Sequence, residues 1–273
     1  MTATIPPRDW TEICWPEIGQ TEPARWIAVL PLAAIEQHGP HLPLGTDVMI
    51  AKTYLERVRE TLPATAPVTF LPLQEIGVST EHLDFPGTLS LPTEVALKSW
   101  MALGTSVARA GIKKLVIVTS HGGNSAAMTL VAQDLRAHHG LFVVTTSWSR
   151  LSAPESLFPP EEVRHGIHGG AVETSIMLAR FAAHVRTDAI ADFRPATLAM
   201  EEKYRWLSTH RPAPFAWQAQ DLHGSGAVGN ATLATADKGA QLIEHGARAF
   251  CELLGEVDEF DVAQLAAGPD ERR

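Results

Sequence analysis

The stretch Lys114-Leu-Val-Ile-Val-Thr119, followed by Ser-His-Gly-Gly-Asn124, decides the fold class of this chain. A short apolar run bounded by glycines predicts a buried β-strand. A helix is predicted over residues 124–139, with Asn124 as its N-cap and Gly140 ending it. Residues 141–146 predict a further strand, and strand, helix and strand in this order are typical of a parallel βαβ unit.

The same alternation extends toward the N-terminus. Apolar runs at residues 26–34 and 68–73 predict two more strands. Helical patterns predict helices over residues 47–60 and 93–110, the second capped by Thr93. We therefore expect an α/β fold, a three-layer α/β/α sandwich with a mainly parallel sheet, formed by residues 1–273 as a single domain.

The pattern is weaker after residue 150. Residues 154–170 are predicted to form a long loop, and residues 173–181 a short helix. Residues 183–232 are predicted to be irregular, because they are rich in proline, glycine and tryptophan. A final helix is predicted over residues 235–254.

Composition excludes several classes of function. A chain of 273 residues that is 45% apolar can bury a sizeable core, and its net charge of −9 argues against binding nucleic acid or anionic membranes through bulk charge. Two cysteines exclude a disulfide framework and a thiolate zinc site. The longest apolar run, residues 26–35, is about half of the ~20 residues that span a bilayer. No signal peptide is recognisable, so we expect a soluble cytoplasmic protein.

Polar residues follow each predicted strand. In open parallel sheets, ligands bind beyond the carboxyl ends of the strands, so these residues are expected at one edge of the sheet. They are Glu36, His38, Asp47, Ser79, Glu81, His82, His121, His168 and Glu173. We expect a metal site at this edge.

The residue types suit metal-assisted hydrolysis. Glu36 and His38 lie two apart on an extended segment and can therefore face the same way. Asp47 opens a predicted helix, and Glu173 lies in the first turn of another, near amide dipoles that favour an anion. Together with His121 they offer three carboxylates and two imidazoles, which suit zinc, manganese or iron. With one bridging carboxylate, such a set can hold two ions roughly 3.5–4 Å apart with a shared hydroxide.

Each residue also has an ordinary interpretation. Glu-x-His is a common pair, and His168 could be a loop histidine, although its place five residues before Glu173 suits proton transfer. We interpret His41 and His82 as supporting or structural residues rather than ligands. The metal hypothesis depends on the joint placement of the residues at strand ends.

Four motifs taken together resemble the creatininase, or creatinine amidohydrolase, family. They are Glu-Gln-His-Gly-Pro-His-Leu-Pro with Thr-Asp (residues 36–47), Glu-His-Leu-Asp-Phe-Pro-Gly-Thr-Leu-Ser (81–90), His-Gly-Gly-Asn (121–124) and His-Gly-Gly-Ala-Val-Glu-Thr-Ser (168–175). The resemblance spans residues 26 to about 180, and residues 229–235 are similar to the family's C-terminal segment.

The resemblance implies a three-layer α/β fold with a centre of two divalent metal ions, often assembled as a hexamer. It also implies hydrolysis of non-peptide C–N bonds in a small-molecule amide. Carried over by matching position, Glu36 and His121 would hold one ion, His38 the other, and Asp47 would bridge them. His168 matches the family's proton-shuttling histidine.

The chain departs from the creatinine-hydrolysing members at two places. Those members have a glutamate where this chain has Gly123, and a tryptophan just before the proton-shuttling histidine, where residues 164–167 contain none. On this resemblance, Glu173 would replace the missing carboxylate. Formamide hydrolysis, or trimming of a redox-cofactor precursor peptide, would fit the same site, and creatinine is not the favoured substrate.

The leading hypothesis is a metal-bridged hydroxide that attacks an amide or formamide carbonyl. The backbone N–H groups of Gly122 and Gly123 would stabilise the oxyanion, and His168 would protonate the departing nitrogen. Ser79 and Glu81 are candidates to bind polar groups of the substrate.

Two other functions compete with this hypothesis. A serine hydrolase would need a Gly-x-Ser-x-Gly elbow, which the chain lacks. A non-catalytic, metal-containing binding protein is the alternative from another class. Zinc is the expected metal, with manganese or iron as alternatives.

Overall fold

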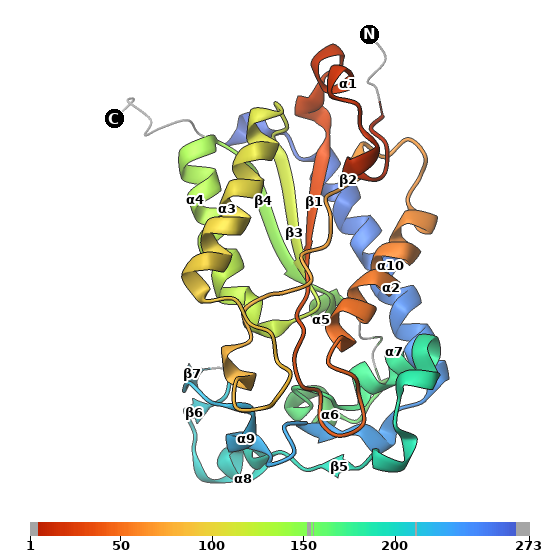
Figure 1. Ribbon diagram of the computed structural model, residues 1–273, viewed down its shortest axis with the longest axis vertical. Helices are drawn as coiled ribbons and strands as arrows, with labels where there is room; N and C mark the ends of the chain where they lie inside the picture. The colour runs from red at the N-terminus through yellow and green to blue at the C-terminus, as the bar shows by residue number, and fades with distance from the viewer. Residues whose placement is uncertain (1–4, 152–153, 155, 211, 266–273) are drawn as a thin grey trace.

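The structure is a computed structural model that describes residues 5–151, 154, 156–210 and 212–265. Its centre is a sheet of four parallel strands in the order β2-β1-β3-β4. The strands are β1 (Ile27–Leu32), β2 (Val68–Phe70), β3 (Lys114–Thr119) and β4 (Phe142–Ser147). Helices cover both faces of the sheet (Figure 1), so the expected three-layer α/β/α architecture is confirmed.

The register of the sheet aligns the carboxyl ends of three strands. Leu32 of β1 pairs with Thr119 of β3, which in turn pairs with Ser147 of β4. Segments that leave these strands therefore begin at the same level, at one edge of the sheet.

One face of the sheet packs against α3 (Thr93–Arg109) and α4 (Ser125–His139). Leu30 and Ile117 point to this side and are fully buried against helix residues such as Trp100. Both faces of the strands are covered, which explains why β1 and β3 are almost continuously apolar in sequence.

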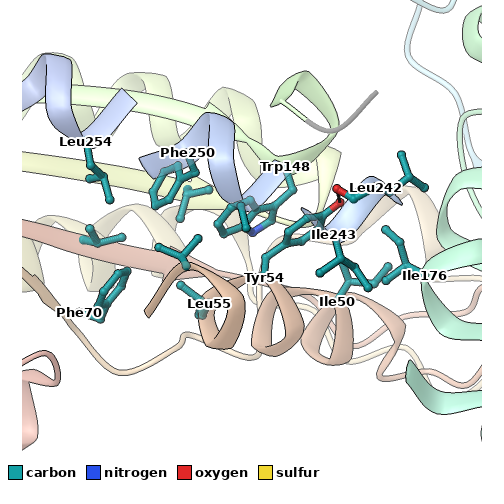
Figure 2. Packing of buried hydrophobic residues seen from close by; sticks show 14 of the residues in the cluster. Ile50, Tyr54, Leu55, Phe70, Trp148, Ile176, Leu242, Ile243, Phe250 and Leu254 are labelled. Carbon is teal, nitrogen blue, oxygen red and sulfur yellow. Dashed lines mark hydrogen bonds between the residues drawn. The ribbon is translucent and has the colours of Figure 1, made fainter. Parts of the chain in front are cut away.

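The other face packs against α2 (Thr46–Thr61), α7 (Ala171–Phe181) and α10 (Ala236–Glu259). Tyr54 of α2 stacks on Trp148, with ring centroids 4.6 Å apart, and Phe250 of α10 contacts the same indole (Figure 2). This aromatic packing joins α2 and α10 to the end of β4.

The remaining elements are short and mostly lie below the carboxyl edge of the sheet in Figure 1. They are α1 (Trp15–Gln20), α5 (Trp148–Leu151), α6 (Pro160–His165), α8 (Ala196–Lys203), α9 (Ala219–Leu222), β5 (Asp192–Phe193) paired with β8 (Gly229–Asn230), and β6 (Leu207–Ser208) paired with β7 (Ala213–Pro214). No helix in the described part of the chain is long and apolar enough to cross a membrane.

Several element predictions are corrected. The predicted loop 154–170 contains α6, which begins at Pro160, and the predicted irregular region 183–232 contains α8. Helix α10 continues beyond residue 254 to Glu259. Proline is favoured in the first turn of a helix, and Pro160 occupies that place in α6.

One predicted cap is wrong, because helix α3 starts at Thr93 itself, with Pro92 at the N-cap position. Asn124 is the N-cap residue of α4, as predicted, but its side chain makes no capping hydrogen bond. Its side chain instead accepts from the Val78 N–H at 2.9 Å and donates to the Ala33 carbonyl at 3.0 Å. The predicted end of α4 is confirmed, because Gly140 adopts the left-handed conformation with φ of 65°.

Candidate metal centre

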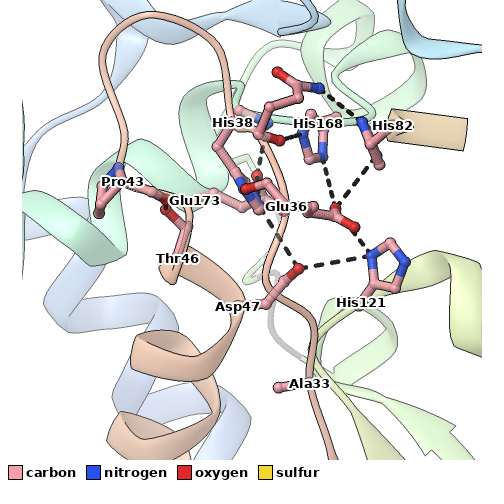
Figure 3. Close-up of polar contacts among 12 residues, drawn as sticks. Ala33, Glu36, His38, Pro43, Thr46, Asp47, His82, His121, His168 and Glu173 are labelled. Carbon is pink, nitrogen blue, oxygen red and sulfur yellow. Dashed lines mark hydrogen bonds and ion pairs between the residues drawn. The ribbon is translucent and has the colours of Figure 1, made fainter. Parts of the chain in front are cut away.

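Six polar side chains from four parts of the chain meet at the carboxyl edge of the sheet (Figure 3). They form three groups whose ligand atoms lie within 4.8 Å of one another, namely Glu36/Asp47/His121, His38/Asp47/Glu173 and Glu36/His38/His168. The first two groups share Asp47 and contain all five of the predicted metal ligands. The structure thus brings these residues together, as expected from their positions after strands of a parallel sheet.

The local structure explains the placement of the carboxylates. The Glu36 N–H donates to the Leu44 carbonyl at 3.0 Å, which closes the loop that follows β1 and leads into α2. Asp47 therefore lies in the first turn of α2. Glu173 lies in the first turn of α7, where its Oε2 accepts from the Gly169 N–H at 2.6 Å.

The two candidate histidine ligands are held by main-chain carbonyls. His38 Nδ1 donates to the Glu36 carbonyl at 3.0 Å, and His121 Nε2 donates to the Val78 carbonyl at 2.8 Å. A carbonyl can only accept, so in the neutral form of each ring, the form that binds a metal ion, the other nitrogen carries a lone pair. His38 Nε2 faces Asp47 Oδ2 at 3.7 Å, and His121 Nδ1 faces Glu36 Oε1 at 3.1 Å.

Several buried acceptors of this site make no hydrogen bond. Within the described residues, these are both carboxylate oxygens of Glu36, Nε2 of His38 and Oδ2 of Asp47, although His121 Nδ1 lies 3.1 Å from Glu36 Oε1. Burying acceptors in this way is unfavourable unless a cation compensates them. Imidazole nitrogens and carboxylate oxygens are ligands for zinc, manganese and iron, so the residues fit divalent cations of this kind.

The electrostatics of the site follow from burial and close charges. Burial alone would raise the pKa of Glu36, but the imidazoles of His121, His168 and His82 bring it well below its usual value. Burial and the nearby Glu36 carboxylate raise the pKa of Asp47 well above its usual value. Burial opposes the charged form of His121, yet Glu36 and Asp47 raise its pKa to about 10.

His168 lies at the rim of the centre with one nitrogen anchored. Its Nε2 donates to the Gln37 carbonyl at 2.5 Å, and its Nδ1 lies 3.6 Å from Glu36 Oε1. Burial and the neighbouring His38 lower the pKa of His168 to about 4. The ring is therefore neutral at pH 7, with a lone pair on Nδ1 that faces the site.

The four residues predicted to contact substrate lie next to His121 in the chain or in space: Glu81 contacts its ring, Gly122 and Gly123 follow it, and Ser79 follows Val78, whose carbonyl binds that ring. Glu81 Oε1 is 3.5 Å from His121 Nε2, the nitrogen that donates to the Val78 carbonyl. Ser79 is buried, and its hydroxyl has no hydrogen-bond partner. A side chain at Gly123 would run into His121 and Glu81, whereas one at Gly122 would meet open space.

The sequence predicted no role for Gln37 and only a supporting or structural role for His82. His82 Nε2 lies 3.3 Å from Glu36 Oε1, and the Gln37 amide donates to His82 Nδ1 at 2.7 Å. The same amide donates to the Gly226 carbonyl at 3.0 Å. The available signal was the alternation of side chains along the extended segment, which points Gln37 away from its two neighbours. His41 is in none of the three groups and bonds Thr174 Oγ1 at 3.0 Å.

A family model described as creatininase, creatinine amidohydrolase, matches residues 11–254. The chain belongs to the creatininase family. This match covers the sheet, the helices on both faces and every residue of the candidate metal centre.

Relatives in the creatininase family carry two kinds of name. A mycofactocin precursor peptide peptidase from Mycobacterium tuberculosis is 31% identical over 227 residues, covering 78% of each chain. A creatinine amidohydrolase from Pseudomonas putida is 27% identical over 251 residues, covering 85% of this chain and 90% of that protein. The chain is thus similar both to a protein named as a peptidase and to one named as an amidohydrolase.

Solved creatininases share the fold. One described as "Creatininase Mn" superposes with a TM-score of 0.73 at 23% identity, covering 93% of this chain and 100% of that chain. A mutant creatininase described as "Zn-Zn type" superposes with a TM-score of 0.72 at 23% identity, covering 93% of this chain and 99% of that chain.

Proposed function

We propose that this creatininase-family chain is a metal-dependent hydrolase that cleaves the C–N bond of a small amide, either cyclic and creatinine-like or a formamide. The observation that carries the proposal is the pair of metal-capable groups sharing Asp47, whose buried acceptor atoms lack partners. Five side chains of this kind have no evident structural use without a cation.

Two divalent cations would be held by these side chains. Glu36, Asp47 and His121 would hold one, while His38, Asp47 and Glu173 would hold the other, with Asp47 shared. Zinc is our first choice, with manganese or iron as alternatives. Bound ions of this kind supply Lewis acidity, which polarises a carbonyl and lowers the pKa of water to about 7.

The chain's own residues would position the substrate and move the proton. His168 Nδ1 would accept a proton from the attacking water and give it to the departing nitrogen, while its Nε2 stays anchored on the Gln37 carbonyl. The N–H groups of Gly122 and Gly123 would donate to the developing oxyanion. Ser79 and Glu81 would contact polar groups of the substrate.

A peptidase is the second candidate function. It is supported by the 31% identity to a mycofactocin precursor peptide peptidase. It is also supported by Gly123, because this chain has a glycine where the resemblance to creatinine-hydrolysing members leads us to expect a glutamate. A cytoplasmic location and a hexameric assembly stay predictions from the sequence.

Metal removal and a substrate panel test the proposal. EDTA-treated protein should lose turnover of creatinine, N-formyl compounds or short peptides, and added zinc, manganese or iron should restore it. His121→Ala should bind less metal by elemental analysis. Full activity after metal removal, or normal metal content in His121→Ala, would contradict the proposal. Bound metal without turnover of any panel member would favour the non-catalytic binding protein.

A further inference from the structure

A cavity of about 170 Å³ opens beside His168 and Glu173, which both line it. It is bounded by α2, by α5 at the end of β4, by the segment of α6 and by α7. Its other walls are mainly apolar, and they include Ile50, Tyr54, Trp148, Phe158, Ile167 and Ile176. Four of these side chains are labelled in Figure 2, where Tyr54 and Trp148 lie side by side.

The polar groups of the cavity are few, and most already have partners. The Glu162 carboxylate accepts from the Ala171 N–H and the Asn230 N–H, each at 2.7 Å. The Ser149 hydroxyl pairs with that of Ser147 at 2.9 Å. By contrast, Ser120 Oγ is buried in the described structure without a hydrogen-bond partner. Apart from the edge that carries His168 and Glu173, the cavity therefore suits an apolar group.

The size of the cavity limits that group. An apolar protein cavity of about 150 Å³ holds one benzene molecule. The cavity beside the metal centre, at about 170 Å³, can thus hold a phenyl ring or a branched aliphatic group. A polar ring placed there would leave most of its hydrogen-bonding atoms unpaired.

The position of His168 indicates which half of the substrate lies in the cavity. In the proposed reaction, His168 Nδ1 gives its proton to the departing nitrogen. Because His168 forms part of the cavity wall, the group attached to that nitrogen is the part of the substrate nearest to the cavity.

We propose that the cavity binds a compact apolar group on the nitrogen side of the scissile amide. The substrate class is then an N-substituted amide, R–CO–NH–R′, with R′ aliphatic or aromatic and about the size of a phenyl or isobutyl group. Water adds to the carbonyl carbon, the C–N bond breaks, and the products are a carboxylic acid and the amine R′NH₂. The inference rests on the proposed function, since it places the amide at the candidate metal centre.

Two formamides that differ only in R′ test the inference on the metal-loaded protein. N-benzylformamide should be hydrolysed with a kcat/KM at least about tenfold above that of N-methylformamide. Ile176→Phe places a larger side chain into the cavity and should remove this preference, so that the two kcat/KM values differ by no more than about twofold. Leu130→Phe is a matched control, because Leu130 is exposed on α4, and it should change neither value.

Binding of benzyl alcohol, which has no amide to hydrolyse, separates this inference from the proposed function. Ligand-observed NMR should detect binding to the wild type and to Leu130→Phe, and binding to Ile176→Phe should be at least about fivefold weaker. If neither formamide is hydrolysed but benzyl alcohol binds in this pattern, the proposed hydrolysis of formamides is wrong and the apolar site stands. Equal kcat/KM for both formamides, or benzyl alcohol binding that Ile176→Phe does not weaken, would overturn the inference.

Should Ile176→Phe fail to fold, Phe158→Ala gives the opposite test. It enlarges the cavity, so the preference should move toward N-(1-naphthylmethyl)formamide by at least about fivefold. An unchanged order of the three formamides in this variant would also overturn the inference.

Discussion

Asp47 is the residue on which the candidate metal centre depends most, because it belongs to two groups that otherwise share no member. Glu36 and His121 approach it from one side, while His38 and Glu173 approach it from the other (Figure 3). A carboxylate in this position can contribute one oxygen to each of two cations.

Neutralising single carboxylates tests this arrangement. Asp47→Asn keeps the side-chain shape but removes the charge shared by both groups, so the variant should lose both metal ions. Glu173→Gln affects one group and should keep about one ion per chain. Elemental analysis measures the content, with Glu75→Gln, an exposed carboxylate paired with Lys52, as the control. Asp47→Asn that retains two ions would show that the residue does not bridge.

The candidate metal ligands could be predicted from the sequence, because residues with metal-binding side chains occur at positions that the fold brings together. The five predicted ligands follow strands or open helices, so the parallel fold brings them to one place. The contact of Gln37 with His82 is different, because it joins residues 45 positions apart through the direction of two side chains. The walls of the cavity likewise combine Ile50 and Tyr54 of α2 with residues that follow β4, and no local sequence pattern predicts this combination.

Among the elements, the short 3₁₀ turn Gly122–Asn124 has space for a side chain at its first glycine but not at its second. A Cβ at Gly122 would contact nothing within 4 Å. A Cβ at Gly123 would collide with the His121 ring and the Glu81 carboxylate. The second glycine is therefore needed for close packing around a candidate ligand.

Alanine substitutions at the two glycines form a matched pair. Gly123→Ala should displace His121, which lowers metal content and reduces kcat/KM at least about tenfold on a hydrolysed amide. Gly122→Ala should leave metal content unchanged. Equal metal contents in the two variants would contradict this account of the turn.

Two features that the sequence did not predict have different physical reasons. Helix α8 buries only Thr197 among its eight residues, so it has no apolar periodicity to recognise. Asn124 was expected to cap its own helix, but buried backbone groups of two other segments bind its amide instead. Tertiary contacts override the local capping preference of Asn124.

At the scale of the whole molecule, cations that bind only the folded chain should stabilise it. An ion present at 100 times its Kd contributes about 2.7 kcal/mol to the free energy of unfolding. The proposed ligands come from segments that are far apart in sequence, so the unfolded chain offers no comparable site.

This stabilisation should increase with pH. The pKa of His121 is raised to about 10, so in the metal-free site this ring holds a proton at neutral pH, and the raised pKa of Asp47 favours its protonated form. Metal binding must displace these protons, and protons compete more strongly as pH falls. The rise in Tm caused by zinc should therefore be larger at pH 8 than at pH 6, with EDTA-treated protein as the reference. A rise that is equal at both pH values would contradict the proton displacement.

The three histidines of the centre share one feature with a consequence for mutagenesis. His38, His121 and His168 are each oriented by a main-chain carbonyl, those of Glu36, Val78 and Gln37. Every amino acid supplies a main-chain carbonyl, so alanine-scanning mutagenesis of Glu36, Val78 and Gln37 would not remove these orienting hydrogen bonds. These contacts depend on the course of the backbone and not on side-chain identity. Another residue could therefore replace Val78 while the imidazole of His121 kept its tautomer and its orientation.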